Sequence, residues 1–459
     1  MVQLMSDQKS TASLEALTNL AKRRGFVFQS AELYGGMGAV YDFGPLGTLL
    51  KQNIRAAWFK RFVQERDDIV AIESALITKR EVLQASGHEE LFVIPLVECK
   101  ICHERFRADQ EIPEVKDHKH ELGEEKEFNE MFPLQIGPTK ESGSMAYLRP
   151  ETAQGMFTNF KQILETSRVK PPFGIAQIGK SFRNEITTGE FIFRLREFEI
   201  AELEYFVKPG TEDGWFEKWV GEWEQFFVDY GVKKENMKRY EHSEKERAHY
   251  SKGTTDILFK FPVGWKELAG IANRTDFDLV QHEKASNKEL RFFDEEEKKA
   301  YRPYVIEPTF GLERAFLAFL TEAYKEYPAG RGGSDASVGT PTPPEGGRRS
   351  EQEIVLHLDP RLAPYKVAVF PLVKKEKLPE IAQKLTQELR KQWFVQYDES
   401  GSIGRRYRRA DEIGTPWCIT VDFDTQKDDA VTIRDRDTMK QERVKLNKVS
   451  DWIAKKLDK

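Results

Sequence analysis

Two neighbouring segments in which apolar and polar side chains alternate constrain the fold of this chain more than any other feature. They cover 175–185 and 191–206, and the connection between them, 186–190, reads ITTGE. Alternation with a period of two is typical of a β-strand, and a short connection that contains Gly joins two such strands into a hairpin. The sequence therefore predicts a long antiparallel β-hairpin.

The predicted hairpin carries charged and aromatic side chains on defined faces, because successive strand residues point to opposite sides. These are Arg183 and Glu185 on the first strand, and Arg194, Arg196, Phe198 and Glu202 on the second. Unpaired charges are costly to bury, so such a face makes a poor core. Arginines match phosphate oxygens and aromatic planes stack on purines, so the face suits a nucleoside triphosphate. A solvated face of ion pairs is the alternative, and residue types alone leave both open.

Other periodicities predict the elements around the hairpin. Helical spacing covers 46–63, and a strand is expected within 68–77. A helix is also expected over 210–230, where an aromatic stripe is predicted to be core rather than a stacking platform for nucleotides. The segment 98–130 is highly charged and is expected to be a surface insertion.

The chain changes character after a segment rich in Gly and Pro. Residues 328–349 contain six Gly and four Pro, which predicts a flexible excursion. Strands are then expected at 365–370, 394–397 and 417–421, and helices at 378–393 and 444–457. This alternation predicts a compact α/β domain of its own.

Composition and charge narrow the class of protein. The net charge is −5, but 364–459 holds 21 Lys and Arg against 16 Asp and Glu, a net of +5, so the rest carries −10. A basic C-terminal part is compatible with a polyanionic partner, although chance variation between domains explains it as well. No apolar run approaches the ~18 residues of a spanning helix, and the N-terminus lacks a secretory h-region. Three cysteines in 459 residues cannot form a disulfide framework, so a cytoplasmic location is expected.

Three motifs in order along the chain resemble those of the class II aminoacyl-tRNA synthetases. The hairpin, at about 175–206, resembles motif 2 through Arg-x-Glu, a loop and Arg-x-x-x-Phe-x-x-x-Glu. Motif 3, a strand that enters a helix with an arginine, fits VIEPTFGLER at 305–314, within about 304–320. Motif 1, a helix followed by a strand at a dimer interface, fits about 46–80.

Further segments resemble the dimeric type of glycyl-tRNA synthetase. They are KRRGFVF at 22–28, YDFGPLG at 41–47, RPETAQG at 149–155, AGIANRTDFDL at 269–279, SIGRRYRR at 402–409 and DEIGTP at 411–416. The resemblance runs from about 14 to 457 and lapses only in the insertions.

This resemblance implies a fold, a function and partners. The expected fold is α/β (α+β): an antiparallel six-stranded catalytic sheet with flanking helices over 1–360, then a mixed-sheet anticodon-binding domain over 361–459. The catalytic part would include a charged insertion at about 98–140 and a flexible loop at about 328–351. The expected activity is that of a glycine–tRNA ligase, with glycine, ATP, Mg²⁺ and glycine tRNA as partners. A homodimer is expected.

The resemblance also assigns site residues by motif. ATP would be bound by Arg183, Asn184, Glu185, Phe193, Arg194, Leu195, Arg196, Glu197, Phe198, Glu267, Leu268, Gly311, Leu312, Glu313 and Arg314, with Arg183 and Arg314 catalytic. Glycine and its adenylate would be bound by Arg107, Glu151, Phe198, Glu199, Ile200, Ala201, Glu202, Glu307, Pro308, Thr309, Phe310 and Gly311. Glu267 would also be a Mg²⁺ ligand, with an ion pair to a neighbouring base as the alternative.

Two weaker patterns add candidate sites. Cys99 and Cys102 have half the spacing of a zinc ribbon, and His103, His118 and His120 could complete a four-ligand site; two surface thiols in a mobile insertion are the alternative, and the one favoured here. The run Arg405, Arg406, Tyr407, Arg408 and Arg409 suits RNA phosphates and an unstacked base, against the alternative of a solvated strand edge.

The sequence departs from the family at three places. Thr309 stands where the family usually has Ser, 77–80 lacks the proline of motif 1, and the region between Arg107 and Glu151 is unlike many members. Two rival functions are a catalytically silent synthetase-like protein that binds nucleic acid, and an enzyme that stops at the adenylate or makes dinucleoside polyphosphates. The presence of Arg183 and Arg314 argues against the first, and the C-terminal domain argues against the second.

Overall fold

A computed structural model describes residues 12–109, 112, 118–138, 145–186, 189–247, 251–328 and 352–458. The largest sheet has seven strands in the order β12-β13-β14-β17-β11-β10-β3. Their bounds are β3 Ile69–Ala71, β10 Phe173–Phe182, β11 Glu197–Val207, β12 Met237–Glu241, β13 Gly253–Phe261, β14 Gly264–Thr275 and β17 Tyr304–Gly311. Six of them form the expected antiparallel sheet, and β3 adds a parallel edge strand beside β10.

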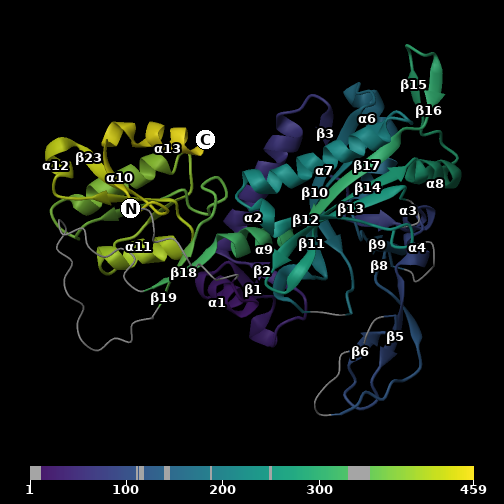
Figure 1. The fold of residues 1–459 in the computed structure, drawn as a ribbon, viewed down its shortest axis with the longest axis horizontal. Coiled ribbons are helices and arrows are strands. Elements are labelled where there is room, and N and C mark those ends of the chain that lie inside the picture. Colours follow the sequence, from purple (N-terminus) through teal and green to yellow (C-terminus); the bar gives the residue numbers. More distant parts are fainter. Residues whose placement is uncertain are drawn as a thin grey trace.

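Helices cover both faces of this sheet (Figure 1). The main core lies on one face and draws on α1 Leu14–Arg24, α2 Pro45–Phe59, α7 Glu212–Asp229 and α9 Leu312–Ala323. A second core on the other face involves α5 Ala153–Thr158, α6 Phe160–Ser167 and α8 Phe277–Ser286. The aromatic stripe of α7 is core as predicted, since Trp219, Trp223, Phe226 and Phe227 are fully buried.

The predicted helix at 46–63 is present as α2 followed by a turn of π-helix, Lys60–Gln64. Pro45 occupies the first turn of α2, where its missing N–H costs nothing. The expected strand within 68–77 is reduced to β3 and the start of β4 Ile77–Lys79. Motif 3 is confirmed as a strand, β17, that runs directly into a helix, α9.

The charged insertion contains a small three-stranded sheet in the order β6-β5-β7, with β5 Val93–Glu98, β6 Arg105–Arg107 and β7 Lys126–Asn129. It projects away from the large sheet at the lower right of Figure 1. A second small sheet, β4-β9-β8, lies at its base, with β8 Phe132–Gln135 and β9 Met145–Leu148. The short helices α3 Arg80–Ala85 and α4 His88–Leu91 precede β5.

Three two-stranded sheets complete the N-terminal part: β1 Val27–Gln29 with β2 Tyr41–Phe43, β15 Phe292–Asp294 with β16 Lys299–Tyr301, and β18 Tyr324–Pro328 with β19 Gln352–Leu356. The last pair brackets the segment rich in Gly and Pro, which lies outside the described residues apart from Pro328.

The C-terminal part forms a mixed five-stranded sheet in the order β21-β20-β22-β23-β24. Its strands are β20 Val367–Pro371, β21 Val395–Tyr397, β22 Trp417–Val421, β23 Ala430–Asp435 and β24 Gln441–Lys445. The helices are α10 Leu378–Leu389, α11 Ile403–Glu412, α12 Thr425–Asp428 and α13 Val449–Leu457. The sequence predicted three of these strands and two of these helices, and it missed α11 and the antiparallel pair β23 and β24. Since most of β20–β23 is buried, this part has its own core.

None of the described helices is long and apolar enough to cross a membrane.

Candidate active site

Strand β11 separates two environments, because its side chains alternate between the faces of the sheet. Ala201 and Leu203 pack into the main core, while Glu202 and Glu204 point to the opposite face. The prediction that Phe198 and Glu202 share a face fits this alternation, and at the end of β11 the Phe198 ring also packs against the main core. The candidate site is therefore built on the face opposite the main core.

The two predicted catalytic arginines approach this face from different elements. Arg183 follows β10, its guanidinium carbon lies 5.6 Å from the centre of the Phe198 ring, and its Nε donates to the carbonyl of Pro150 at 3.1 Å. Arg314, in the first turn of α9, places its guanidinium carbon 4.6 Å from the centre of the Phe193 ring. Its Nη1 lies 3.0 Å from Oε2 of Glu267, so the ion pair predicted as the alternative for Glu267 is present.

The loop between β10 and β11 corrects the predicted hairpin. The first strand ends at Phe182 and the second begins at Glu197, so Arg183, Arg194 and Arg196 lie in the connection rather than on strands. A 3₁₀ turn, Phe191–Phe193, packs into the main core and draws the chain out of the ladder. Alternation along a strand consequently does not decide where these three arginines point.

Arg194 and Arg196 differ in what they contact. Arg194 Nη1 lies 4.0 Å from Oε2 of Glu185 and is one of the more exposed arginines of the site. Arg196 donates from Nε to the carbonyl of Glu185 at 3.2 Å and from Nη1 to that of Gly38 at 3.1 Å. Arg196 thus holds the N-terminal loop against the site, and Arg194 is the better placed of the two for a ligand.

Glu130, which the sequence reading missed, lies among the arginines of the insertion and the hairpin. Burial and then the charge of Glu185 raise its pKa, whereas Arg107, Arg183 and Arg194 oppose this shift. Its carbonyl accepts from the backbone N–H of Asn184 at 2.7 Å. Arg107 itself pairs with Asp109 at 2.8 Å. The insertion therefore delivers Arg107 and Glu130 to the edge of the motif 2 loop.

Three buried carboxylates lie together on this face of the sheet and are here called the acid pocket. They are Glu202, Glu204 and Glu307, and one oxygen of each lies within 4.8 Å of the others. Thr152 donates to Glu202 from its backbone N–H at 3.1 Å and from its hydroxyl. Arg274 Nη1 donates to Glu307 Oε1 at 2.8 Å. Among the described residues, neither oxygen of Glu204 has a hydrogen-bond partner. The pocket thus holds more carboxylates than bases.

The pKa values in the acid pocket reflect this excess of acid. Burial raises the pKa of Glu307 to about 8; the charges of Glu202 and Glu151 add to the shift and Arg274 opposes it. Burial and the charge of Glu151 raise the pKa of Glu202, and burial with the charge of Glu307 raises that of Glu204. A positive charge bound in the pocket would reverse these shifts.

Glu151 stands beside the acid pocket and already has a partner. His88 Nε2 lies 3.1 Å from its Oε2, and Gln154 Nε2 donates to its Oε1 at 3.0 Å. Although burial acts in the other direction, His88 and Arg274 hold the pKa of Glu151 well below its usual range. Glu151 is therefore charged at neutral pH.

Arg274 and Asp278 hold the floor of the site, and neither was predicted as a site residue. Arg274 donates from Nε to Asp278 Oδ2 at 2.8 Å and from Nη2 to Oδ1 at 2.9 Å, and both residues are fully buried. Arg274 lies near the end of β14 and Asp278 in the first turn of α8, and both fall within 269–279, a segment that carries the family resemblance. His88 and Glu204 carried no comparable signal.

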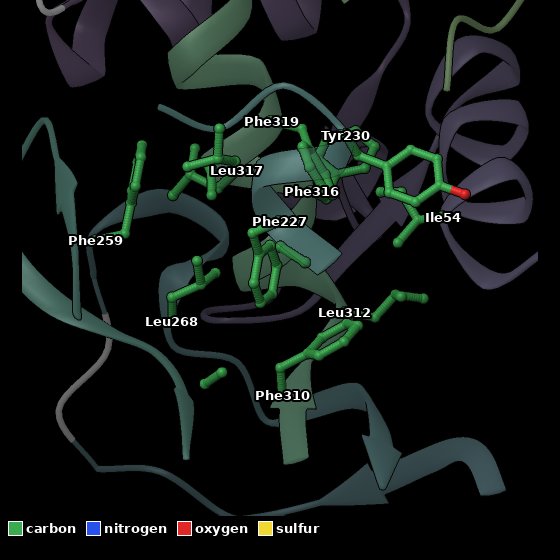
Figure 2. Packing of buried hydrophobic residues seen from close by; sticks show 14 of the residues in the cluster. Ile54, Phe227, Tyr230, Phe259, Leu268, Phe310, Leu312, Phe316, Leu317 and Phe319 are labelled. Atoms are coloured by element: carbon green, nitrogen blue, oxygen red, sulfur yellow. The ribbon is translucent and has the colours of Figure 1, made fainter. Parts of the chain in front are cut away.

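Several predicted residues turn their side chains away from the site. Glu199 and Glu313 share Lys51, whose Nζ donates to them at 2.9 and 2.6 Å. Glu197 pairs with Lys180 at the surface. Five apolar residues are buried in the main core: Leu195, Ala201, Leu268, Phe310 and Leu312 (Figure 2 labels the last three). The five apolar residues can present only their backbone to a ligand, since their side chains are packed in the core.

Other predicted residues are arranged across neighbouring strands. Glu202 of β11 pairs with Thr309 of β17, which pairs with Gly270 of β14. In the next row Glu307 pairs with Ala272. Small side chains thus lie beside the carboxylates. Ile200 shares the face of Phe198 by alternation, and Pro308 and Gly311 flank Thr309 on β17.

The cluster at 405–409 forms a helix, α11, so the alternative of a strand edge is wrong. Arg406 is buried and donates to the carbonyls of Gly401 and Pro371. The Tyr407 ring packs edge-on against Phe370, with its hydroxyl on Thr420. Arg408 and Arg409 pair with Glu353 and Asp398. Tyr407 is therefore not available to stack on a base, while Arg405 and Arg408 are exposed.

Comparison with known proteins gives a consistent family. Residues 137–324 match a family described as "tRNA synthetase class II core domain (G, H, P, S and T)", and 366–456 match "Anticodon binding domain". The chain is 49% identical to a glycine–tRNA ligase of Streptomyces coelicolor, covering 97% of this chain and 98% of that protein. It is 48% identical to one of Bifidobacterium longum, covering 97% and 93%.

A solved structure supports the same fold. The structure of prolyl-tRNA synthetase from Cryptosporidium parvum aligns with a TM-score of 0.64 at 14% identity, covering 99% of this chain and 77% of that one. At this identity the likeness concerns the fold alone.

Proposed function

The chain belongs to the glycine–tRNA ligase family of class II aminoacyl-tRNA synthetases, and we propose that the face described above carries out both steps of that reaction. The carboxylate of glycine first attacks the α-phosphate of ATP and pyrophosphate leaves. The terminal ribose hydroxyl of the tRNA then attacks the glycyl carbonyl and AMP leaves. Such chemistry depends on positioning and charge neutralisation more than on proton transfer.

The hairpin loop is proposed to hold ATP. Arg183, which is already held against Phe198, would contact the α-phosphate and the glycine carboxylate, and the Phe198 ring would stack on adenine. Glu185 would meet the adenine amino group and Arg194 the phosphate tail. Arg314 would leave Glu267 for the γ-phosphate. Arginine forks suit this role because they bind phosphate oxygens bidentately.

Glu267 is the residue proposed to hold Mg²⁺ with the phosphates. Its carboxylate is half exposed, and together with burial its charge raises the pKa of nearby Asp256. Two acidic groups close together fit a divalent cation, which takes one or two carboxylates plus phosphate oxygens. The bound ion would neutralise charge on the phosphates.

The observation that carries the assignment of glycine is the unbalanced acid pocket. The pocket holds three carboxylates close enough together to contact one bound cation, those of Glu202, Glu204 and Glu307, and Arg274 is the base beside them. The pKa values of all three carboxylates are raised. An ammonium group would supply the missing positive charge and hydrogen bonds. Phosphate would be repelled, so the pocket is proposed to receive the amino end of glycine and not ATP.

Selection against alanine requires a wall at the α-carbon of the substrate. Dispersion alone separates two substrates that differ by a methyl by only ~1–3 kcal/mol. Thr309 lies in the same row of the sheet as Glu202 and Gly270, and its methyl group is proposed to narrow the space above them.

The division of labour between two domains is also proposed. Residues 1–360 would form the catalytic domain and 361–459 the domain that binds the anticodon arm of glycine tRNA. The exposed Arg405 and Arg408 on α11 support a contact with RNA phosphates. A cytoplasmic location is proposed with this, because three cysteines in 459 residues suit a reducing compartment.

A homodimer formed through motif 1 is part of the proposal. A cavity of about 1090 Å³ is bordered by α2, the π-turn and 73–76, and it lies outside the acid pocket. Phe59, Leu76 and Ile77 are exposed around these elements. Apolar side chains beside a large hollow favour a protein partner. Light scattering of the eluted protein should give twice the mass of one chain.

Pyrophosphate exchange tests the function. Wild-type protein should exchange pyrophosphate into ATP with glycine and much less with alanine or serine, and it should then charge glycine tRNA. Arg183→Ala should abolish exchange because Arg183 is the residue proposed to hold the α-phosphate. Arg239→Ala, a surface arginine on β12 paired with Glu224, is the matched control and should leave exchange unchanged.

The outcomes separate the rival functions. Exchange without charging would favour an enzyme that stops at the adenylate. Near-normal exchange by Arg183→Ala would remove Arg183 from its proposed role.

A further inference from the structure

Four potential metal ligands meet at the tip of the insertion, far from the acid pocket in the chain. They are the thiols of Cys99 and Cys102 and the imidazoles of His118 and His120, and one ligand atom from each lies within 4.8 Å of the other three. Cys99 is fully buried and the other three are half-buried. His103, another candidate from the sequence, instead places Nδ1 3.3 Å from Glu98 Oε1.

Two separations between these atoms match those between neighbouring ligands of a tetrahedral ion. Cys99 Sγ lies 3.5 Å from His118 Nε2, and Cys102 Sγ lies 3.7 Å from His120 Nδ1. Zinc binds sulfur at about 2.3 Å and imidazole nitrogen at about 2.0–2.1 Å, so a tetrahedral angle holds the two ligand atoms about 3.6 Å apart. The side chains therefore already stand at the spacing that a shared ion would impose.

The backbone around Cys99 and Cys102 forms a tight turn that presents both sulfurs to one side. Cys99 N–H donates to the carbonyl of Glu104 and His103 N–H to that of Cys99, both at 2.9 Å. Ile101 N–H lies 3.4 Å from Cys99 Sγ and points at it. An N–H donor on a ligand sulfur stabilises a thiolate, which is the form that binds zinc.

A second chain segment, 118–122, brings the histidines to this turn. Lys100 N–H donates to the carbonyl of Glu121 and Gly123 N–H to that of Glu98, both at 2.8 Å, and Cys99 pairs with Leu122 in an isolated bridge. The Phe106 ring lies 4.7 Å from that of His120 and covers one side of the cluster. The ligands thus come from two chain segments that backbone hydrogen bonds already hold side by side at this end.

The insertion has little else to hold it together. Within the described part of 98–130, Cys99 is the one buried residue, and none of the buried residues of β5, Ile94 and Val97, belongs to a hydrophobic cluster. Small modules without a core usually depend on a metal or on disulfides. A bound ion would add a side-chain cross-link between the turn and the segment 118–122 to the backbone hydrogen bonds that already join them.

We propose that Cys99, Cys102, His118 and His120 bind one structural zinc ion, which fixes the β5–β6–β7 sheet and so holds Arg107 and Glu130 at the edge of the active site. All four positions are filled by protein, so the ion has no open site for catalysis. Each thiol releases its proton on binding, and both histidines bind as neutral imidazoles.

Metal analysis of the intact protein tests this. Protein purified without chelator should hold about one zinc per chain by mass spectrometry of the metal, and His118→Ala should lower this content more than tenfold. His103→Ala is the matched control, since this histidine sits in the same turn but faces Glu98, and it should keep its zinc. Protein reloaded with cobalt should show the intense visible bands of a tetrahedral thiolate site.

Two results would overturn the proposal. One is wild-type protein without zinc that, when offered cobalt, shows no thiolate–cobalt absorption; this measurement does not depend on how well any variant folds. The other is a disulfide between Cys99 and Cys102 in freshly prepared, metal-free protein. Limited proteolysis should additionally cut within 98–130 faster after the zinc is removed, with the rest of the chain unchanged.

Discussion

Two groups of buried charges, one in each half of the molecule, are arranged in opposite ways. In the C-terminal sheet, Arg434 donates to both oxygens of Asp411, at 3.0 and 2.9 Å, and nothing in this pair is left over. In the acid pocket, Arg274 donates to Glu307 and also to Asp278, Thr152 donates to Glu202, and Glu204 has no hydrogen-bond partner among the described residues. The Asp411–Arg434 pair balances its charges internally, while the acid pocket has a deficit of positive charge.

This difference separates a structural role from a binding role. A buried ion pair whose groups are fully hydrogen-bonded needs no ligand, whereas uncompensated buried carboxylates destabilise the empty site. The empty acid pocket is destabilised in this way, and the same deficit of positive charge attracts an ammonium group. Similar residue types thus carry different functions according to whether their charges are matched.

The largest effect should come from removing the arginine of each half. Arg274→Leu leaves Glu307 and Asp278 buried without a base, so we expect a loss of about 3–5 kcal/mol in the free energy of unfolding and loss of glycine-dependent exchange. Arg434→Leu leaves Asp411 unpaired and should cost a similar amount. Chemical denaturation and pyrophosphate exchange of each variant measure both effects.

Arg274→Leu and Arg434→Leu should differ in their kinetics. Arg434→Leu should keep the wild-type KM for glycine per folded molecule, because its arginine touches no proposed substrate contact. If Arg434→Leu abolished exchange while remaining folded, or if Arg274→Leu kept it, the distinction between the two halves would be wrong.

A smaller effect is expected when one carboxylate of each half is neutralised. Glu202→Gln removes a charged acceptor for the ammonium group, so the KM for glycine should rise by about 10- to 150-fold, which corresponds to ~1.5–3 kcal/mol. Its unfolding free energy should not fall, since an excess negative charge is removed. Asp411→Asn should instead lower the unfolding free energy and leave the KM for glycine unchanged. A clear destabilisation by Glu202→Gln would contradict the claimed excess of acid.

The protonation of Glu307 gives a third test, because its pKa is raised to about 8 from 4.5. The folded protein then holds a proton that the unfolded chain loses near pH 4.5, so the stability from this group is complete below that pH and falls as pH rises towards 8. Glycine binding should expel the proton. Calorimetry at pH 7 in buffers of different ionisation enthalpy should show release of up to about one proton.

This release of a proton on glycine binding should be specific to the acid pocket. Asp411 and Arg434 should contribute no buffer-dependent heat, so the Asp411→Asn variant should release the same number of protons as the wild type. A heat of glycine binding that does not vary with the buffer would argue that Glu307 is already ionised.

Much of the fold was predictable, because regular periodicity reports burial on one face. The α7 stripe, the antiparallel pairing of β10 with β11 and three of the C-terminal strands followed from it, whereas the six-stranded sheet was implied by the family resemblance. What failed was local: Arg194 and Arg196 were placed on a strand, but the packing of Phe191–Phe193 into the core ends the ladder early. Whether residues pair in a strand or pack into the core depends on tertiary contacts, and the alternation of apolar and polar residues does not report these contacts.

The site was predictable only where a motif named the residue. Motifs located Arg183, Phe198 and the carboxylates, yet they also included Leu268 and Phe310, whose side chains are in the core. They omitted Arg274 and Glu204, because charge balance is a property of the assembled pocket and not of a segment. Likewise, Tyr407 in a basic run resembled a stacking platform until the helix turned it inwards.

The smallest effect should separate two adjacent arginines of α11, and it extends the same comparison to the RNA surface. Arg405 is exposed, so Arg405→Ala should weaken tRNA binding only a few-fold and lower the salt dependence by about 0.7–0.9 in log–log slope, as expected for one lost phosphate contact. The guanidinium of Arg406 donates to the backbone carbonyls of Gly401 and Pro371. Arg406→Ala should therefore lower the melting temperature of the C-terminal part instead. Titration of tRNA at several salt concentrations, with thermal unfolding in parallel, distinguishes the two. Equal losses of affinity with an unchanged salt slope would mean that neither arginine contacts phosphate and that α11 does not face the tRNA.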